Sequence, residues 1–276
     1  MRTALLTTAA LIGFAANSLL TRGALGHAWS DAPAFTIIRL ATGAVTLAIL
    51  VRARKTPPAE HGGWMSALAL AGYAVAFTLA YTRIGAGIGA LLLFGAVQVT
   101  MIATGLLRGE RPLGRDWFSV ALASAGLAWL TLPGAAAPNT TGALLMLAAG
   151  ACWGAYSLAG RSSRDPLAAT SGNFWRATIL GTAALVFLMD TSRLTWRGAL
   201  LAAVSGSLAS GVGYTLWYAA LPSLTAWRAA LLQLSVPVIT ALAASFLLAE
   251  AIPSRLFVAA VLVFAGVLLS LPSGRR

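Results

Sequence analysis

Two arginines stand inside stretches that are otherwise apolar. Arg39 lies in FTIIRLATG (35–43), and Arg176 lies in NFWRATILG (173–181). A charged side chain within a bilayer costs several kcal/mol on insertion scales, so such a residue has either a function or a partner at its own depth. Each arginine is close enough to one end of its stretch to extend toward an interface. The sequence therefore predicts a structural clamp for both, with a gate element and direct contact with a ligand as the alternatives.

Aromatic residues and isolated amides recur on the faces of other apolar stretches. Tyr73, Phe77 and Tyr81 are spaced by four, and so are Tyr214 and Tyr218, which places each set on one face of a helix. Hydroxyls and amides seek polar partners that lipid cannot offer, so we expect these faces to point into a helical bundle. An apolar packing seam and ordinary interhelical hydrogen bonds are the alternatives. The residues expected to line a central cavity are Asn17, Phe77, Tyr81, Gln98, Trp153, Tyr156, Tyr214, Trp217, Tyr218 and Gln233.

Acidic residues and histidines avoid the centres of the apolar stretches. All seven Asp and Glu residues, together with His27 and His61, lie in loops or at the ends of those stretches. Membrane proteases need paired aspartates, a zinc motif or a serine with a histidine, and a proton relay needs titratable groups at mid-depth. The single Cys152 offers no metal motif. We therefore expect no enzyme, no metal, no cofactor and no proton relay, and the absence of lysine from these stretches also disfavours phosphorylated ligands.

Small residues gather in two runs, GAGIGA (85–90) and SGSLASGVG (205–213). Such runs suit close packing of helices, with a hinge as the alternative. They do not form a phosphate-binding loop, because no lysine follows them and no strand precedes them.

The composition requires that most of the chain lies in lipid. Of its 276 residues, 59% are hydrophobic and 9% are charged, with a mean hydropathy of +0.83, whereas soluble domains average about 25% charged residues. Because unpaired backbone cannot face lipid, and a span takes ~20 apolar residues, the sequence predicts an all-α polytopic membrane protein of ten transmembrane helices. The expected helices cover residues 3–22, 32–52, 64–83, 87–107, 115–132, 140–160, 167–189, 197–219, 224–249 and 253–271.

The net charge of +12 comes from short basic clusters between the apolar stretches. Such clusters suit lipid headgroups and membrane insertion, so the lipid bilayer is an expected partner and nucleic acid is not. With the N-terminus inside, twelve cationic residues fall on the cytoplasmic side and five on the outer side, and the other two are Arg39 and Arg176. The positive-inside rule then places both termini in the cytoplasm.

Two long stretches of the chain run alike. Residues 80–112 and 217–253 align Tyr81 with Tyr218 and Glu110 with Glu250. We therefore expect two five-helix repeats, 1–134 and 135–276. Because five is odd, the second repeat crosses the membrane in the opposite sense, which is the inverted arrangement of many transporters.

The inverted repeat also suggests partners for the two buried arginines. The expected helices place Arg39 at the same outer level as Glu250, and Arg176 at the same inner level as Glu110. Partners at matched depth would offset the cost of burial. We expect two pseudo-symmetric clamps across the halves, with helix C-terminal carbonyls as the alternative partners.

Several motifs together resemble the drug/metabolite transporter superfamily, EamA type, including its aromatic amino acid exporters. These motifs are WGAYSLAGR (153–161) echoed by FAANSLLTRG (14–23), an arginine early in the second and seventh helices, and a proline-containing ninth helix ending in LLAEAIP (247–253). The chain departs from the family where Phe14 and Asn17 replace a common Trp and Gly, and where Val97 stands opposite Pro237. The resemblance covers nearly the whole chain and implies export of small metabolites across a bacterial inner membrane.

We therefore expect a secondary transporter that exports small neutral or amphipathic metabolites, with aromatic or other neutral amino acids foremost. Alternating access through a wide, aromatic and uncharged cavity would move them down their own gradient, with affinities nearer millimolar than micromolar. The alternatives are a membrane enzyme acting on lipid, proton-coupled efflux of drugs or metabolites, and a membrane scaffold. The oligomeric state stays open, and a monomer suits this reading.

Overall fold

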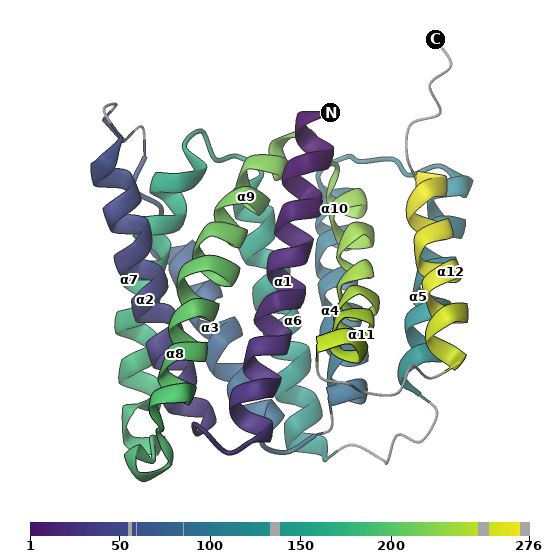
Figure 1. Cartoon of the computed structure of the whole chain (residues 1–276). Helices are drawn as coiled ribbons and strands as arrows, with labels where there is room; N and C mark the ends of the chain where they lie inside the picture. The colour runs from purple at the N-terminus through teal and green to yellow at the C-terminus, as the bar shows by residue number, and fades with distance from the viewer. Residues whose placement is uncertain (55–56, 59, 85, 133–138, 248–253, 271–276) are drawn as a thin grey trace.

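The computed structural model describes residues 1–276 except 55–56, 59, 85, 133–138, 248–253 and 271–276. The described residues form helices joined by loops, with no strand among them (Figure 1). The longer helices are α1 (Arg2–Gly26), α2 (Ala32–Ala53), α3 (Trp64–Tyr81), α4 (Ala86–Leu107), α5 (Gly114–Thr131), α6 (Thr140–Gly160), α7 (Pro166–Leu185), α8 (Trp196–Val204), α9 (Gly213–Ala220), α10 (Ala226–Gln233), α11 (Ser235–Leu247) and α12 (Ser254–Ser270). Short helical turns η1 (Val186–Leu188), η2 (Thr191–Arg193) and η4 (Leu221–Ser223) join some of them, and η3 (Ser205–Val212) connects α8 to α9.

Seven helical segments of the described chain are long and apolar enough to cross a membrane. One of them runs from Trp196 to Ser223 through α8, η3 and α9, and another runs from Ala226 to Leu247 through α10 and α11. The remaining segments, α5, α7 and the shorter apolar α12, complete the bundle and follow the order expected from the sequence. The prediction of an all-helical polytopic membrane protein is confirmed.

Side chains at the start of several helices satisfy backbone groups that the helix itself leaves free. Asp31 accepts a hydrogen bond from Ala34 N at 3.3 Å at the start of α2, and Asp165 accepts one from Ala168 N at 3.2 Å at the start of α7. Both helices also carry a proline in the first turn, where its missing N–H costs nothing. These caps fix where α2 and α7 leave the interface and enter the apolar layer.

Several extensively packed helix pairs join the first part of the chain to the second. α2 packs on α7, α3 on α6, α5 on α12, and α1 on α9. In Figure 1 the α5–α12 pair stands at one end of the bundle, and α2 with α7 stands at the other. α1 begins and α12 ends at the upper face of the bundle, whereas α1 ends at the lower face (Figure 1).

A π-helical segment interrupts the span between Trp196 and Ser223. This segment, η3, covers Ser205–Val212. It lies directly against α2: a Cβ on Gly206 would collide with the carbonyl oxygen of Arg39 and the hydroxyl of Thr42. Thr42 Oγ1 also donates to the carbonyl of Ala203 at 3.3 Å. The small residues therefore allow the two backbones to touch, as the run SGSLASGVG suggests.

Candidate functional site

A cavity of about 510 Å³ lies inside the bundle, a size within the range of small-molecule sites. Its wall comes from nearly all parts of the chain, from α1 to α12. The residues that line it are Phe14, Asn17, Ser18, Arg22, Tyr73, Phe77, Tyr81, Ala90, Leu93, Phe94, Leu130, Thr131, Trp153, Tyr214, Gln233, Val236, Pro237, Thr240, Ala241, Ser245 and Arg255. Six residues expected from the sequence to line a cavity are thus brought together: Asn17, Phe77, Tyr81, Trp153, Tyr214 and Gln233.

The cavity runs from the middle of the bundle toward one face. Phe14 and Trp153 lie midway along α1 and α6, whereas Tyr81 and Thr131 are the last residues of α3 and α5. In Figure 1 the helix α1 ends at the lower face, on the side where Arg22 lines the cavity. We call this end of the cavity the mouth and the opposite end the floor.

Aromatic rings meet edge to face at the floor. The ring centroid of Phe14 lies 5.3 Å from Trp153, 5.5 Å from Tyr214 and 5.6 Å from Trp217, at interplanar angles of 87°, 79° and 73°. This is the geometry that aromatic quadrupoles prefer. Phe14 is therefore the centre of the cluster, although the sequence marked it only as a departure from a family pattern. Its position three residues before Asn17, on the same face of α1, was the available signal.

Gln233 holds the indole of Trp153 in place. Its Oε1 accepts a hydrogen bond from Trp153 Nε1, and its Nε2 donates to the carbonyl of Ala229 at 3.2 Å. Gln233 ends α10, and Pro237 lies in the first turn of α11, so the backbone is interrupted where the amide is needed. Both the oxygen and the nitrogen of the Gln233 amide are thus hydrogen-bonded within the protein.

Asn17 collects three donors on one oxygen. Arg39 Nη1 donates to Asn17 Oδ1 at 3.1 Å, Ser205 Oγ donates at 2.6 Å, and Ser210 Oγ donates at 3.5 Å. Arg39 itself is 3% exposed, and its guanidinium carbon lies 6.0 Å from the ring centroid of Tyr73. The guanidinium is thus located directly behind two residues of the cavity wall.

Four residues expected at the cavity lie outside its wall. Trp217 donates to Ser157 Oγ at 3.1 Å, and Tyr218 donates to the carbonyl of Tyr156 at 3.0 Å. These three aromatic residues fill the space between the floor and the face where α6 ends. Gln98 instead accepts from Ser124 Oγ at 3.0 Å on α5. This corrects the expectation that all four line the cavity, because helical spacing gives a face of one helix but not its depth or its neighbour.

The cavity also carries charge that the sequence reading placed at the interfaces. Arg22 and Arg255 line its wall, at the end of α1 and the start of α12. Polar groups of Ser18, Thr131 and Ser245 lie on the same wall. The expectation of an uncharged cavity is wrong, because both arginines extend from helix ends into the mouth.

Glu110 and Arg176 have separate partners. Glu110 accepts from the backbone N–H of Ala226 with both carboxylate oxygens at 2.9 Å, and it pairs with Arg161 Nη2 at 2.7 Å. It therefore caps α10 and joins α4 to the end of α6. The expected pairing with Arg176 is wrong, because Glu110 instead binds Arg161 and the start of α10.

Arg176 binds carbonyl groups at the interface. Its Nη1 donates to the carbonyls of His61 at 2.8 Å and Gly172 at 2.9 Å, and its guanidinium carbon lies 5.4 Å from the ring centroid of Trp64. The other expected clamp, Arg39 with Glu250, cannot be traced, because Glu250 lies outside the described residues.

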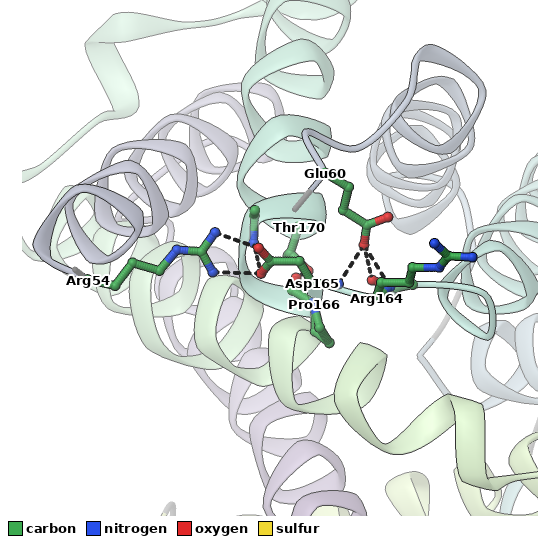
Figure 2. A network of polar contacts seen from close by, with 8 residues as sticks. Arg54, Glu60, Arg164, Asp165, Pro166 and Thr170 are labelled. Atoms are coloured by element: carbon green, nitrogen blue, oxygen red, sulfur yellow. Dashed lines mark hydrogen bonds and ion pairs between the residues drawn. The ribbon is translucent and has the colours of Figure 1, made fainter. Parts of the chain in front are cut away.

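A second polar network joins the chain after α2 to the start of α7. Arg54 forms a two-pronged ion pair with Asp165, at 2.7 and 2.5 Å, and this hydrogen bonding raises the pKa of Arg54 (Figure 2). Glu60 accepts hydrogen bonds from the Ser163 hydroxyl and from the backbone N–H groups of Arg164 and Asp165. Together with the Glu110–Arg161 pair, these contacts lie on the face opposite the mouth, and we call them the closed-face links.

Comparison with known proteins agrees with this arrangement. Residues 140–271 match the EamA-like transporter family. The chain is 50% identical over 271 residues to the uncharacterized protein PA1977 of Pseudomonas aeruginosa, covering 98% of this chain and 94% of that one. A crystal structure of another protein shares the fold at a TM-score of 0.86 and 18% identity, over 99% of this chain and 98% of that one. The chain thus belongs to the EamA-like transporter family.

Proposed function

We propose that this protein exports small amphipathic metabolites, with aromatic or other neutral amino acids foremost, by alternating access through its central cavity. The observation that carries the proposal is the aromatic cavity of about 510 Å³ with polar groups along its wall. Rings of Phe14, Trp153 and Tyr214 offer stacking and edge contacts to an apolar side chain. Amides and hydroxyls offer hydrogen bonds to the polar end of the same molecule. The substrate-binding residues in this proposal are Asn17, Phe77, Tyr81, Trp153, Tyr214 and Gln233, with Phe14 and Tyr73 added.

Two features support alternating access. The cavity reaches one face of the bundle. The opposite face is closed by the closed-face links and by Tyr156, Trp217 and Tyr218, which pack between that face and the floor. The helix pairs also map onto one another when residues 1–134 are exchanged with 135–276, since α3 on α6 corresponds to α9 on α1. Two inverted repeats of this kind would rock around a central site.

Transport of the solute down its own gradient, without a coupled ion, is the simplest mechanism for a cavity with this wall. Among the described residues that line the cavity, none is Asp, Glu or His, so the wall supplies no side chain that changes charge between pH 5 and 8. We place the protein in the bacterial inner membrane with the mouth outward and both termini in the cytoplasm. The charge bias of the loops supports this orientation, and so does the common face at which α1 begins and α12 ends.

The test is flux through purified protein in liposomes. Radiolabelled phenylalanine, tyrosine and leucine should leave liposomes that contain the protein faster than they leave protein-free liposomes loaded in the same way. Each solute should be recovered chemically unchanged, as expected for a transporter but not for an enzyme. Trp153→Ala and Tyr81→Ala should lower this flux, because each removes part of the wall. Trp117→Ala is the matched control, since Trp117 is 47% exposed at the start of α5 and lies away from the cavity.

Two results would overturn the proposal. Unchanged flux in both cavity variants would exclude this cavity as the route. Accumulation against the solute gradient under an imposed pH difference would exclude simple facilitation.

A further inference from the structure

The Asn17 carboxamide is oriented by its surroundings. Its Oδ1 accepts from Arg39, Ser205 and Ser210, which approach from α2 and η3. All three are donors to this oxygen, so the amide cannot be turned around without placing Nδ2 against Arg39. Because Asn17 also lines the cavity, and its Nδ2 bonds to none of the described residues, the Nδ2 hydrogens are the part of the amide left for a ligand.

Arg39 is a buried cation without a carboxylate among its described partners. It is 3% exposed, its Nη1 donates to Asn17, and its Nε has no hydrogen-bond partner within the described part of the chain. The Tyr73 ring at 6.0 Å offers only a weak, polarizable contact. A buried guanidinium is costly until a negative charge compensates it. The positive charge of Arg39 therefore lies directly behind Asn17, which lines the cavity.

The two observations point to one ligand chemistry. A hydrogen bond from a cation to the amide oxygen polarises the amide and strengthens its N–H groups as donors. Strengthened donors with a cation behind them favour an anionic acceptor over a neutral one. Phe14 lies three residues before Asn17 on α1, so an apolar group of the same ligand would reach the aromatic floor.

We propose that Asn17 Nδ2, backed by Arg39, binds the carboxylate of the transported solute at the inner end of the cavity. This rests on the proposed function and narrows it to carboxylate-bearing solutes with an aromatic or apolar side chain. Asn17 is the contacting residue, and Arg39, which acts through it, is a positioning residue. Tyr73 and Tyr214 complete the surroundings of the bound carboxylate.

The experiment compares three ligands that share one ring: phenylalanine, phenylalaninamide and phenethylamine. Binding is measured by quenching of tryptophan fluorescence in detergent, and flux is measured separately in liposomes. Phenylalanine should bind about tenfold more tightly than phenylalaninamide, which keeps the ring and the amine but lacks the negative charge.

Asn17→Asp is the informative variant. A carboxylate at this position still accepts from Arg39, Ser205 and Ser210, so the fold keeps its contacts, but it offers no donor and repels a second carboxylate. The preference should then reverse toward phenethylamine. Ser207→Ala is the matched control: Ser207 lies in η3 between Ser205 and Ser210, but its hydroxyl donates to the carbonyl of Ala203 at 2.7 Å, and it is part of neither the cavity wall nor the Asn17 network. It should leave the ratio unchanged.

The outcomes separate the two proposals. Equal affinity for phenylalanine and its amide in the unmodified protein, or an unchanged preference in a folded Asn17→Asp variant, overturns the carboxylate subsite even if flux is observed. If Asn17→Asp does not fold, the comparison of ligands in the unmodified protein decides. A clear preference in binding without flux of any of the three would instead uphold the subsite and reject transport of these solutes.

Discussion

A single hydrogen bond from Trp153 fixes the largest ring of the cavity floor. Trp153 is 5% exposed and contacts the rings of Phe14, Tyr73 and Tyr214 at centroid distances of 5.3, 5.0 and 4.7 Å. Its indole N–H has its acceptor in Gln233. A buried donor that loses its acceptor costs about 1–3 kcal/mol, so the rings around it depend on this amide for their arrangement.

Replacement of Gln233 by methionine tests this dependence. Gln233→Met keeps the length of the side chain but removes the acceptor, so we expect a loss of about 1–3 kcal/mol in stability and a lower flux of aromatic solutes. Thermal unfolding in detergent and liposome flux measure the two effects. Gln98→Met is the control, because Gln98 is equally an amide on an apolar helix but accepts only from Ser124, away from the cavity. Equal loss of flux in both variants would contradict the role of Gln233.

Comparable side chains on comparable helices thus have different roles, which the sequence could not separate. Asn17, Gln98 and Gln233 each interrupt an apolar stretch, and burial of all three could be predicted from the cost of an amide in lipid. Which of them reaches the cavity depends on the rotation of each helix and on its neighbours. Both are decided by packing between distant parts of the chain.

Among the elements, η3 lies in direct backbone contact with α2. Gly206 lies under the carbonyl of Arg39, and a Cβ on Gly43 would lie 2.9 Å from the carbonyl oxygen of Gly206. π-helical turns occur often at functional sites. Here the segment supplies Ser205 and Ser210 to Asn17, so its geometry and the polar network depend on each other.

Gly206→Ala should disturb both the geometry of η3 and the hydrogen bonds to Asn17. The added methyl group has no space between η3 and α2, so we expect a loss of more than about 2 kcal/mol in stability and reduced binding of the carboxylate ligand. Gly95→Ala on α4 is the control, because a Cβ there meets nothing within 4 Å, and the substitution should be neutral or gain up to about 1 kcal/mol of helix stability. Similar melting temperatures for the two variants would show that the contact with α2 is not tight.

The sequence predicted the helices well because length and hydropathy determine them. It predicted close packing for the run 205–213, which the structure has, but not its π-helical winding. The winding depends on contacts with α1 and α2, more than 150 positions earlier in the chain. Such contacts cannot be predicted from the local composition of residues 205–213.

At the scale of the whole molecule, the closed-face links hold one side of the bundle shut. Glu110 connects α4 to Arg161 and to the first turn of α10, and Asp165 connects α7 to Arg54. Under alternating access, the opposite state requires these contacts to break. Weakening them should therefore raise the population of the state that opens toward this face.

Glu110→Gln should produce that shift. The amide still offers one acceptor to Ala226 N but loses the ion pair with Arg161, which is partly exposed. The reporter is a cysteine at Ser157, a position with 0% exposure beneath the floor, in a Cys152→Ala background. We expect a thiol reagent applied from the side of the closed-face links to label Ser157→Cys about fivefold faster when Glu110→Gln is present.

The control for this shift is an ion pair outside the closed-face links. Asp190 pairs with Arg193 at 3.0 Å on the exposed surface between α7 and α8. Asp190→Asn should leave the labelling rate of Ser157→Cys as it was. Equal acceleration by both variants would mean that labelling reports general loosening of the protein rather than opening of one face.

The π-helical segment has a consequence for how relatives of this chain could differ in what they carry. In a regular α-helix, Ser205 and Tyr214 would point about 180° apart, since they are nine residues apart at about 100° each. Here Ser205 bonds Asn17 and Tyr214 meets Phe14, so both reach the same face of α1. Winding this segment as a regular α-helix would turn Tyr214 away from the cavity without changing hydropathy or length. Two chains that look equivalent by composition would then present different walls to a solute, and the angular phase of one helix would decide what each one recognises.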